Sequence, residues 1–216
     1  MITTPQLIAL LATSATPVQR LRPPLLRAIC WMSLAALVFA LLAAGHGVRH
    51  DFAQRIAQPI FAVGLAAALM TGVLAAIAAF FISLPDRSRA WGLLPVPALL
   101  VWVSTVTYGC LSQWVDIGPD GMRIGETARC FATLMLTSLP LSLGLFLMLR
   151  HAAWLRPTAV TLTGGLAVAA LTATALSLFH DLDATVMVLL WNLGVAAMIV
   201  GTSYALGLRA RALAGT

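Results

Sequence analysis

Residues 59–84 read PIFAVGLAAALMTGVLAAIAAFFISL and contain no charged side chain. A helix needs about 20 apolar residues to cross a hydrocarbon core of ~30 Å, and this stretch exceeds that length. Further apolar runs of similar length lie at Leu25–Ala44, Trp91–Leu111, Cys130–Leu149, Thr158–Phe179 and Ala184–Leu206. We therefore predict an all-α membrane protein with six transmembrane helices in a single bundle.

The arginines predict the orientation of this bundle. All 13 basic residues are arginines, and most fall in the N-terminal segment, the second and fourth connections and the C-terminal tail. This larger set comprises Arg20, Arg22, Arg27, Arg87, Arg89, Arg150, Arg156, Arg209 and Arg211. The other connections hold only Arg49, Arg55, Arg123 and Arg129. Because basic residues of short loops stay on the cytoplasmic side, we expect both termini in the cytoplasm.

The composition excludes a soluble domain. The chain of 216 residues is 61% hydrophobic and 9% charged, with a mean hydropathy of +0.96. We expect a cytoplasmic amphipathic segment at 1–22, a transmembrane domain at 23–208 and a short cytoplasmic tail at 209–216. The net charge of +6 fits anionic lipid headgroups of the bilayer, and no direct contact with nucleic acid is expected.

The N-terminal segment has a pattern of its own. Thr4 followed by Pro5 is typical of a helix start, with an N-cap residue and then proline at the first helical position. A short helix ending near residues 13–17 would be apolar over more than half its circumference, through Leu7, Ile8, Leu10 and Leu11. A helix of about two turns is unstable alone in water, so it must dock on the bilayer, the bundle or a partner.

Small residues and prolines distinguish individual spans. Small residues in the second and fifth spans predict close helix packing, while prolines in the third and fourth predict bends or tightened ends. These prolines are Pro95, Pro97 and Pro140.

The cytoplasmic loop Leu84–Ala90 reads LPDRSRA, and with the next residue it forms a motif of Pro85, Asp86, Arg87, Arg89 and Trp91.

The predicted outer face carries Cys110 and Cys130, which close the third span and open the fourth. Two neighbouring antiparallel helices would place both thiols at a similar depth. The pair could form a structural disulfide worth about 3 kcal/mol, act as a redox switch, bind a soft metal with His180 as an auxiliary ligand, or be neighbours by accident. Cys30 is expected to be a small buried hydrophobe. No cofactor is expected, apart from the open question of a metal at the two thiols.

Catalysis is not expected, because no Ser–His–Asp set, HExxH motif or glycine-rich phosphate loop is present. No ionisable residue lies in the middle of a span, whereas ion-coupled transporters generally need one at depth. A carrier of neutral solutes or a small-molecule receptor stays an alternative, with a polar-lined cavity near Thr105, Thr107 and Asn192. A scaffold with a permanent disulfide is a second alternative.

Short motifs over nearly the whole chain carry a family resemblance. They include LIALL at Leu7–Leu11, FISLPDRSRAWGLLP at Phe81–Pro95, Cys110, Cys130, and VLLWN at Val188–Asn192. In their order and spacing the chain resembles the NrsF family of membrane anti-sigma factors, named for negative regulation of sigma F.

This resemblance implies a six-span protein of the bacterial inner membrane that holds an extracytoplasmic-function (ECF) sigma factor inactive. It also implies release of the factor under metal or oxidative envelope stress, with Cys110 and Cys130 as the sensing thiols. Since the sigma factor is a cytoplasmic protein, its binding candidates are Leu7, Ile8, Leu10 and Leu11. Oligomeric state is left open.

Overall fold

The computed structural model describes residues 3–14, 22–113, 124–149, 157–179 and 194. Within these ranges the regular structure is entirely helical. The α-helices are α1 (Thr4–Ser14), α2 (Pro24–His46), α3 (Phe52–Ile56), α4 (Pro59–Ile82), α5 (Val96–Gln113), α6 (Ile124–Leu149) and α7 (Pro157–Phe179), with a 3₁₀ helix, η1 (Arg89–Leu93), before α5.

Five stretches of the described chain are long and apolar enough to cross a membrane. They are Pro24–Gly45, Pro59–Ile82, Arg89–Tyr108, Ala132–Leu149 and Pro157–Phe179. Each coincides with one predicted span, so the prediction of an all-α membrane bundle is confirmed for these five. The sixth predicted span, Ala184–Leu206, lies outside the described residues.

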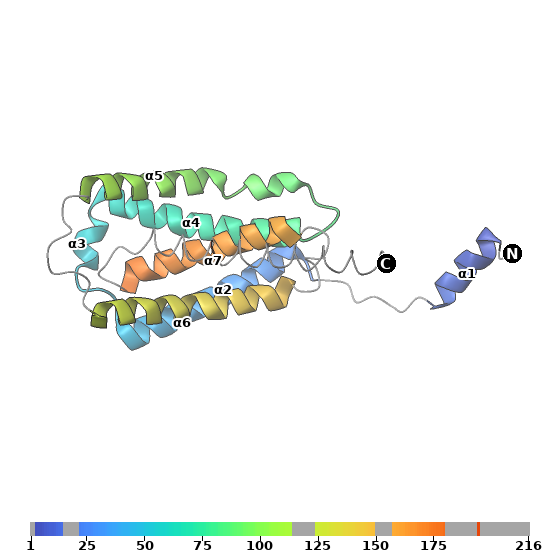
Figure 1. Ribbon diagram of the computed structural model, residues 1–216, viewed down its shortest axis with the longest axis horizontal. Helices are drawn as coiled ribbons and strands as arrows, with labels where there is room; N and C mark the ends of the chain where they lie inside the picture. The colour runs from blue at the N-terminus through green and yellow to red at the C-terminus, as the bar shows by residue number, and fades with distance from the viewer. Residues whose placement is uncertain (1–2, 15–21, 114–123, 150–156, 180–193, 195–216) are drawn as a thin grey trace, which may run out of the picture.

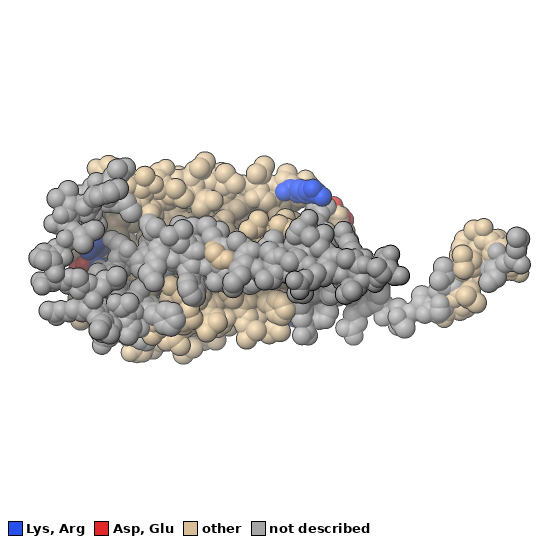
Figure 2. All heavy atoms as spheres, in the orientation of Figure 1, with Lys and Arg blue, Asp and Glu red and all other residues tan. Residues whose placement is uncertain are grey.

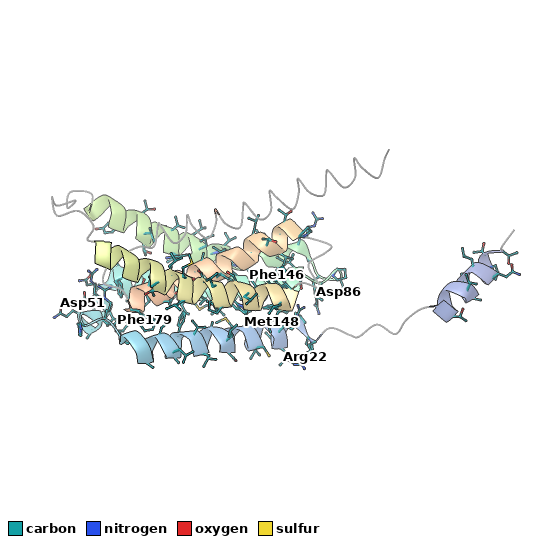
Figure 3. The ribbon with its side chains drawn as sticks, turned by 60° about the horizontal axis from the view of Figure 1, so that its bottom comes forward. Arg22, Asp51, Asp86, Phe146, Met148 and Phe179 are labelled. Carbon is teal, nitrogen blue, oxygen red and sulfur yellow. The ribbon has the colours of Figure 1, made fainter. Side chains whose placement is uncertain are left out.

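The five long helices lie side by side along the long axis of the molecule (Figure 1). Helix α4 packs most extensively against α7 and then α5, while α6 packs against α7 and α2. On the face shown in Figure 2, the described charged side chains gather at the two ends of the bundle. Figure 3 shows Arg22 and Asp86 at one end and Asp51 at the other. We call these the cytoplasmic end and the outer end, after the orientation that the arginine pattern predicts.

Small residues bring α4 and α7 together, as their composition predicts. Ala75 and Ala76 of α4 are fully buried, as are Ala167 and Ala169 of α7. A Cβ atom added to Gly72 would lie 2.8 Å from Cγ of Leu171, closer than real Cβ contacts come. Because lipid does not drive two apolar helices together, such close backbone packing is what holds a pair of this kind.

Prolines act differently in the third and fourth spans. The third span is divided into η1 and α5, with the buried Pro95 at the junction, so the predicted tightening is confirmed there. Pro140 lies inside α6, which continues through it. A proline in a helix removes one backbone hydrogen bond, and neighbouring helices in a bundle compensate for this loss.

Helix α1 is longer than predicted and begins one residue earlier. Thr4 is already helical, and the backbone N–H of Thr3 donates to Oε1 of Gln6 at 3.0 Å. This contact is half of a capping box, in which the side chain at the third helical position satisfies the N-cap amide. The prediction of Thr4 as the N-cap is therefore wrong by one residue. In Figures 1 and 3, α1 lies apart from the bundle, beyond its cytoplasmic end.

Candidate functional site

The two candidate sensing cysteines belong to helices that end or begin at the outer end of the bundle. Cys110 lies near the end of α5 and Cys130 near the beginning of α6. Helix α5 ends and α6 begins at the same end of the bundle (Figure 1). The side chains of Cys110 and Cys130, and all of His180, lie outside the described residues. Within the described part of the chain, no group of three or more His, Cys, Asp or Glu could hold a metal ion.

Helices α5 and α6 are consecutive, yet their main packing partners differ. Helix α5 packs mainly against α4, and α6 packs mainly against α7 and α2. The two share one apolar cluster, in which Trp102 of α5 and Leu134 of α6 pack with alanines of α4 and α7. The expectation that these two spans are direct neighbours is therefore not supported among the described residues, where α5 and α6 share a cluster with α4 and α7 but do not pack extensively against each other.

The outer end also holds an ion cluster that sequence reasoning missed. Nε and Nη2 of Arg49 lie 2.5 and 3.0 Å from the two carboxylate oxygens of Asp51, and Nε of Arg55 lies 3.1 Å from the same carboxylate. The Arg49 side chain is 1% exposed, which is rare for arginine unless it is paired. The signal in the sequence is the spacing of Asp51 and Arg55, four residues apart.

Arg49 joins this cluster to α7. Its backbone N–H donates to the carbonyl oxygen of Leu178 at 3.1 Å. That carbonyl is among the last four of α7, which have no partner within their own helix. Asp51 and Phe179 accordingly lie at the same end in Figure 3. The connection between α2 and α3 is thus hydrogen-bonded to the last turn of α7, which directly precedes His180.

The contribution of the Asp51 carboxylate to the stability of this ion cluster depends on pH. Hydrogen bonds from Arg49, and then from Arg55, lower the pKa of Asp51 to about 2. A carboxylate with a lowered pKa in the folded state stabilises the fold above its unfolded pKa of ~3.9. This contribution is lost as the pH falls through the folded value near 2.

We expect Asp51→Asn to lower the unfolding temperature at pH 7, because Arg49 loses its carboxylate partner. The difference from wild type should shrink between about pH 4 and pH 2, as the wild-type carboxyl becomes protonated. Thermal unfolding of the detergent-solubilised protein at several pH values measures this. Asp86→Asn is the matched control, because that carboxylate is exposed at the opposite end of the bundle and its ion pair with Arg87 has the longer distance of 3.7 Å. If the difference in unfolding temperature between the variant and wild type stays constant over the whole pH range, the lowered pKa of Asp51 is contradicted.

At the cytoplasmic end, the predicted loop motif is organised by aromatic rings. The rings of Phe81 and Trp91 stack with their centroids 4.4 Å apart, and the guanidinium of Arg87 lies 5.7 Å from the Phe81 ring centre. Ser88 Oγ accepts the backbone N–H of Ala90 at 3.2 Å and begins η1. Trp91 is half-buried, whereas Pro85, Asp86, Arg87 and Arg89 are exposed. The polar part of the motif is therefore accessible at this end.

A second arginine, Arg27, is buried, although the sequence analysis counted it among the basic residues of the predicted cytoplasmic side. The residue is 6% exposed, and its Nη2 donates to the carbonyl oxygen of Met148. Its guanidinium carbon lies 5.1 Å from the centre of the Phe80 ring, and its Nη1 is buried without a hydrogen-bond partner among the described residues. Arg27 thus joins α2, α4 and α6. Its position in the first turn of an apolar run was the only signal in the sequence.

Cys30 corrects another expectation, because it is exposed rather than buried. Its neighbours on α2, Ala28 and Trp31, face the core instead. Every side of this helix is rich in apolar residues, so composition did not indicate which side faces the bundle.

The polar groups that would line a carrier cavity are satisfied within their own helix. Oγ1 of Thr105 donates to the Trp102 carbonyl at 2.7 Å, and Oγ1 of Thr107 donates to the Val103 carbonyl at 2.9 Å. Thr107 is also exposed on the outside of α5. Asn192, the third such group, lies outside the described residues. These two threonines therefore give no support to a polar-lined transport site.

Comparison with known proteins gives one match. The model of a family described as NrsF, negative regulator of sigma F, matches residues 11–211. No match was found among curated proteins or among solved structures. The matched range covers all five long helices and leaves out most of α1.

Proposed function

The chain belongs to the NrsF family of negative regulators of sigma F, and from this premise we propose that it is a membrane anti-sigma factor for an ECF sigma factor. It acts as a regulator rather than an enzyme. It resides in the bacterial inner membrane with both termini in the cytoplasm. Metal or oxidative stress, sensed at Cys110 and Cys130 on the periplasmic side, releases the sigma factor.

The exposure of α1 is the observation that carries the cytoplasmic half of this proposal. Leu7, Ile8 and Leu10 are 46%, 62% and 61% exposed, although each could bury its side chain against another apolar surface. Helix α1 lies apart from the bundle beyond its cytoplasmic end (Figures 1 and 3). Amphipathic helices of this kind bind by inserting their apolar face into a groove of a partner. We assign that groove to the sigma factor.

The loop motif offers a second contact for the same partner. Asp86, Arg87 and Arg89 are exposed. Asp86 lies at the same end of the bundle as Arg22, which precedes α2 (Figure 3). Charged groups around an apolar contact contribute to orientation and association rate more than to affinity. In this proposal α1 provides the affinity and the loop provides the orientation.

Thiol chemistry at the outer end provides the signal. An oxidant such as diamide would take two electrons and two protons from the thiols of Cys110 and Cys130, leaving a disulfide and a hydrazine. Cd²⁺ would instead bind the two thiolates and displace two protons, since soft metals prefer sulfur ligands. Either event links the end of α5 to the beginning of α6 and so changes how these two helices are placed relative to each other. His180 is an auxiliary ligand for the metal in this scheme.

Recovery of the sigma factor tests the proposal directly. The full-length protein, solubilised in detergent from its own cells, is expected to bring down a sigma factor. The same protein without residues 1–15 is expected to lose it, because α1 is gone. Failure of the intact chain to retain a sigma factor would contradict the proposed function. Equal recovery with both forms would move the binding site from α1 to the loop Leu84–Ala90.

A further inference from the structure

Helices α2 and α6 meet along one continuous stripe. Residues Arg27, Trp31 and Leu34 follow one another on α2 at spacings of four and three, which places them on one face. Nε1 of Trp31 donates to the carbonyl oxygen of Leu141 at 3.0 Å in the buried interior. A Cβ atom added to Gly144 would lie 2.5 Å from Cδ2 of Leu34. The two helices are therefore in close contact over this stripe.

Arg27 forms the cytoplasmic end of the stripe. Its hydrogen bond goes to Met148, the residue before the last of α6. The final four carbonyls of a helix lack partners within the helix, and a cation near them interacts favourably with the helix dipole. Arg27 thus holds the end of α6 without opening any bond inside α6. Met148 and Arg22 lie toward the same end in Figure 3.

The two helices connect the two halves of the proposed switch. Helix α6 begins at Ile124 and includes Cys130, which lies roughly 27 Å from Met148 along a helix rising about 1.5 Å per residue. Helix α2 begins at Pro24 and continues the chain that comes from α1. Helix α6 continues through Pro140 over this length, so we expect a shift along its axis at one end to reach the other.

We propose that Arg27 is a positioning residue that passes a displacement of α6 to the start of α2. This inference rests on the proposed function and adds the route by which the thiols at the outer end act on the cytoplasmic end of the bundle. A hydrogen bond has a narrow range of favourable distances. A shift of about 1 Å at Met148 therefore either moves Arg27 with it or breaks the bond between them. In either case the start of α2 would take up a second position after the shift, and a second position is what a switch requires.

The test replaces Arg27 in the full-length protein and measures sigma-dependent reporter activity with and without cadmium chloride or diamide. Arg27→Met keeps an unbranched side chain of similar length and removes both the charge and the donor. Repression without stress should be retained, because α1 is unchanged, while induction by stress should fall at least fivefold. Arg27→Lys keeps a cationic donor and should restore induction to within twofold of wild type.

Arg22→Met is the matched control, because it removes an exposed arginine from the same end of the bundle. It should induce like wild type. Normal induction in Arg27→Met, release without stress in that variant, or an equal loss in Arg27→Lys would each overturn the proposal. Immunoblots of membranes establish that all variants are present in equal amounts.

A second measurement uses the wild-type chain and so does not depend on how the variants fold. Hydrogen exchange in lipid nanodiscs is followed before and after addition of cadmium chloride. The last turn of α6 and the first turns of α2 should change together. A change in α6 alone, or in neither helix, would overturn the coupling. Failure of the proposed function would be recognised separately, because wild-type protein would then retain no sigma factor.

Discussion

Replacing Leu7 and Leu11 together with Asp should release the sigma factor and raise sigma-dependent transcription at least tenfold without any stress. The two positions are four residues apart and share one face of α1. Burying one leucine contributes about 1.5–3 kcal/mol, so losing two weakens binding by at least ~3 kcal/mol, or about a hundredfold. A reporter assay and recovery of the sigma factor with the purified variant measure both effects.

The matched control adds the same charges to the opposite face of α1. Ala9 and Thr13 are also four residues apart, and at about 100° per residue they lie across the helix from Leu7 and Leu11. Ala9→Asp with Thr13→Asp should repress normally. Equal release by both double variants would mean that charge on α1, rather than its apolar face, disrupts binding. Unchanged repression in the leucine variant would contradict binding through this face.

Alanine at either Cys110 or Cys130 should abolish release of the sigma factor under diamide or cadmium while leaving repression intact. One thiol can neither form the intramolecular disulfide nor provide the two-sulfur site for a metal. Induction should fall from its wild-type value to close to the uninduced level in both single variants. Gel-shift labelling with a maleimide reagent would show whether the wild-type thiols disappear on stress.

Cys30→Ala is the control for this experiment. Cys30 is exposed on α2, near the cytoplasmic end and far along the bundle from the other two cysteines, so its loss should not change induction. Normal induction in both the Cys110 and Cys130 variants would remove the thiols from the mechanism. Thiols that resist labelling both before and after stress would instead favour a permanent disulfide.

Much of the fold follows from the length of apolar runs alone. The run at 59–84 appears in the structure as α4, Pro59–Ile82, because a chain in lipid must satisfy its backbone hydrogen bonds within a helix. Proline placement likewise predicts the break before α5. The start of α1 is the exception: Thr4 with Pro5 matches a common N-cap pattern, yet the contact of Thr3 with Gln6 places the cap one residue earlier.

The sequence by itself determined the five long helices that the structure describes, the family, and the residue types available for the proposed sensing and binding. The tertiary structure alone decided which side of each helix is covered. In spans that are apolar on every side, the pattern of residues carries little information about direction. This is why Arg27 was unexpected when found buried, and Cys30 when found exposed. Burial of Arg27 depends on the carbonyl of Met148, which only the packing of α6 against α2 brings close.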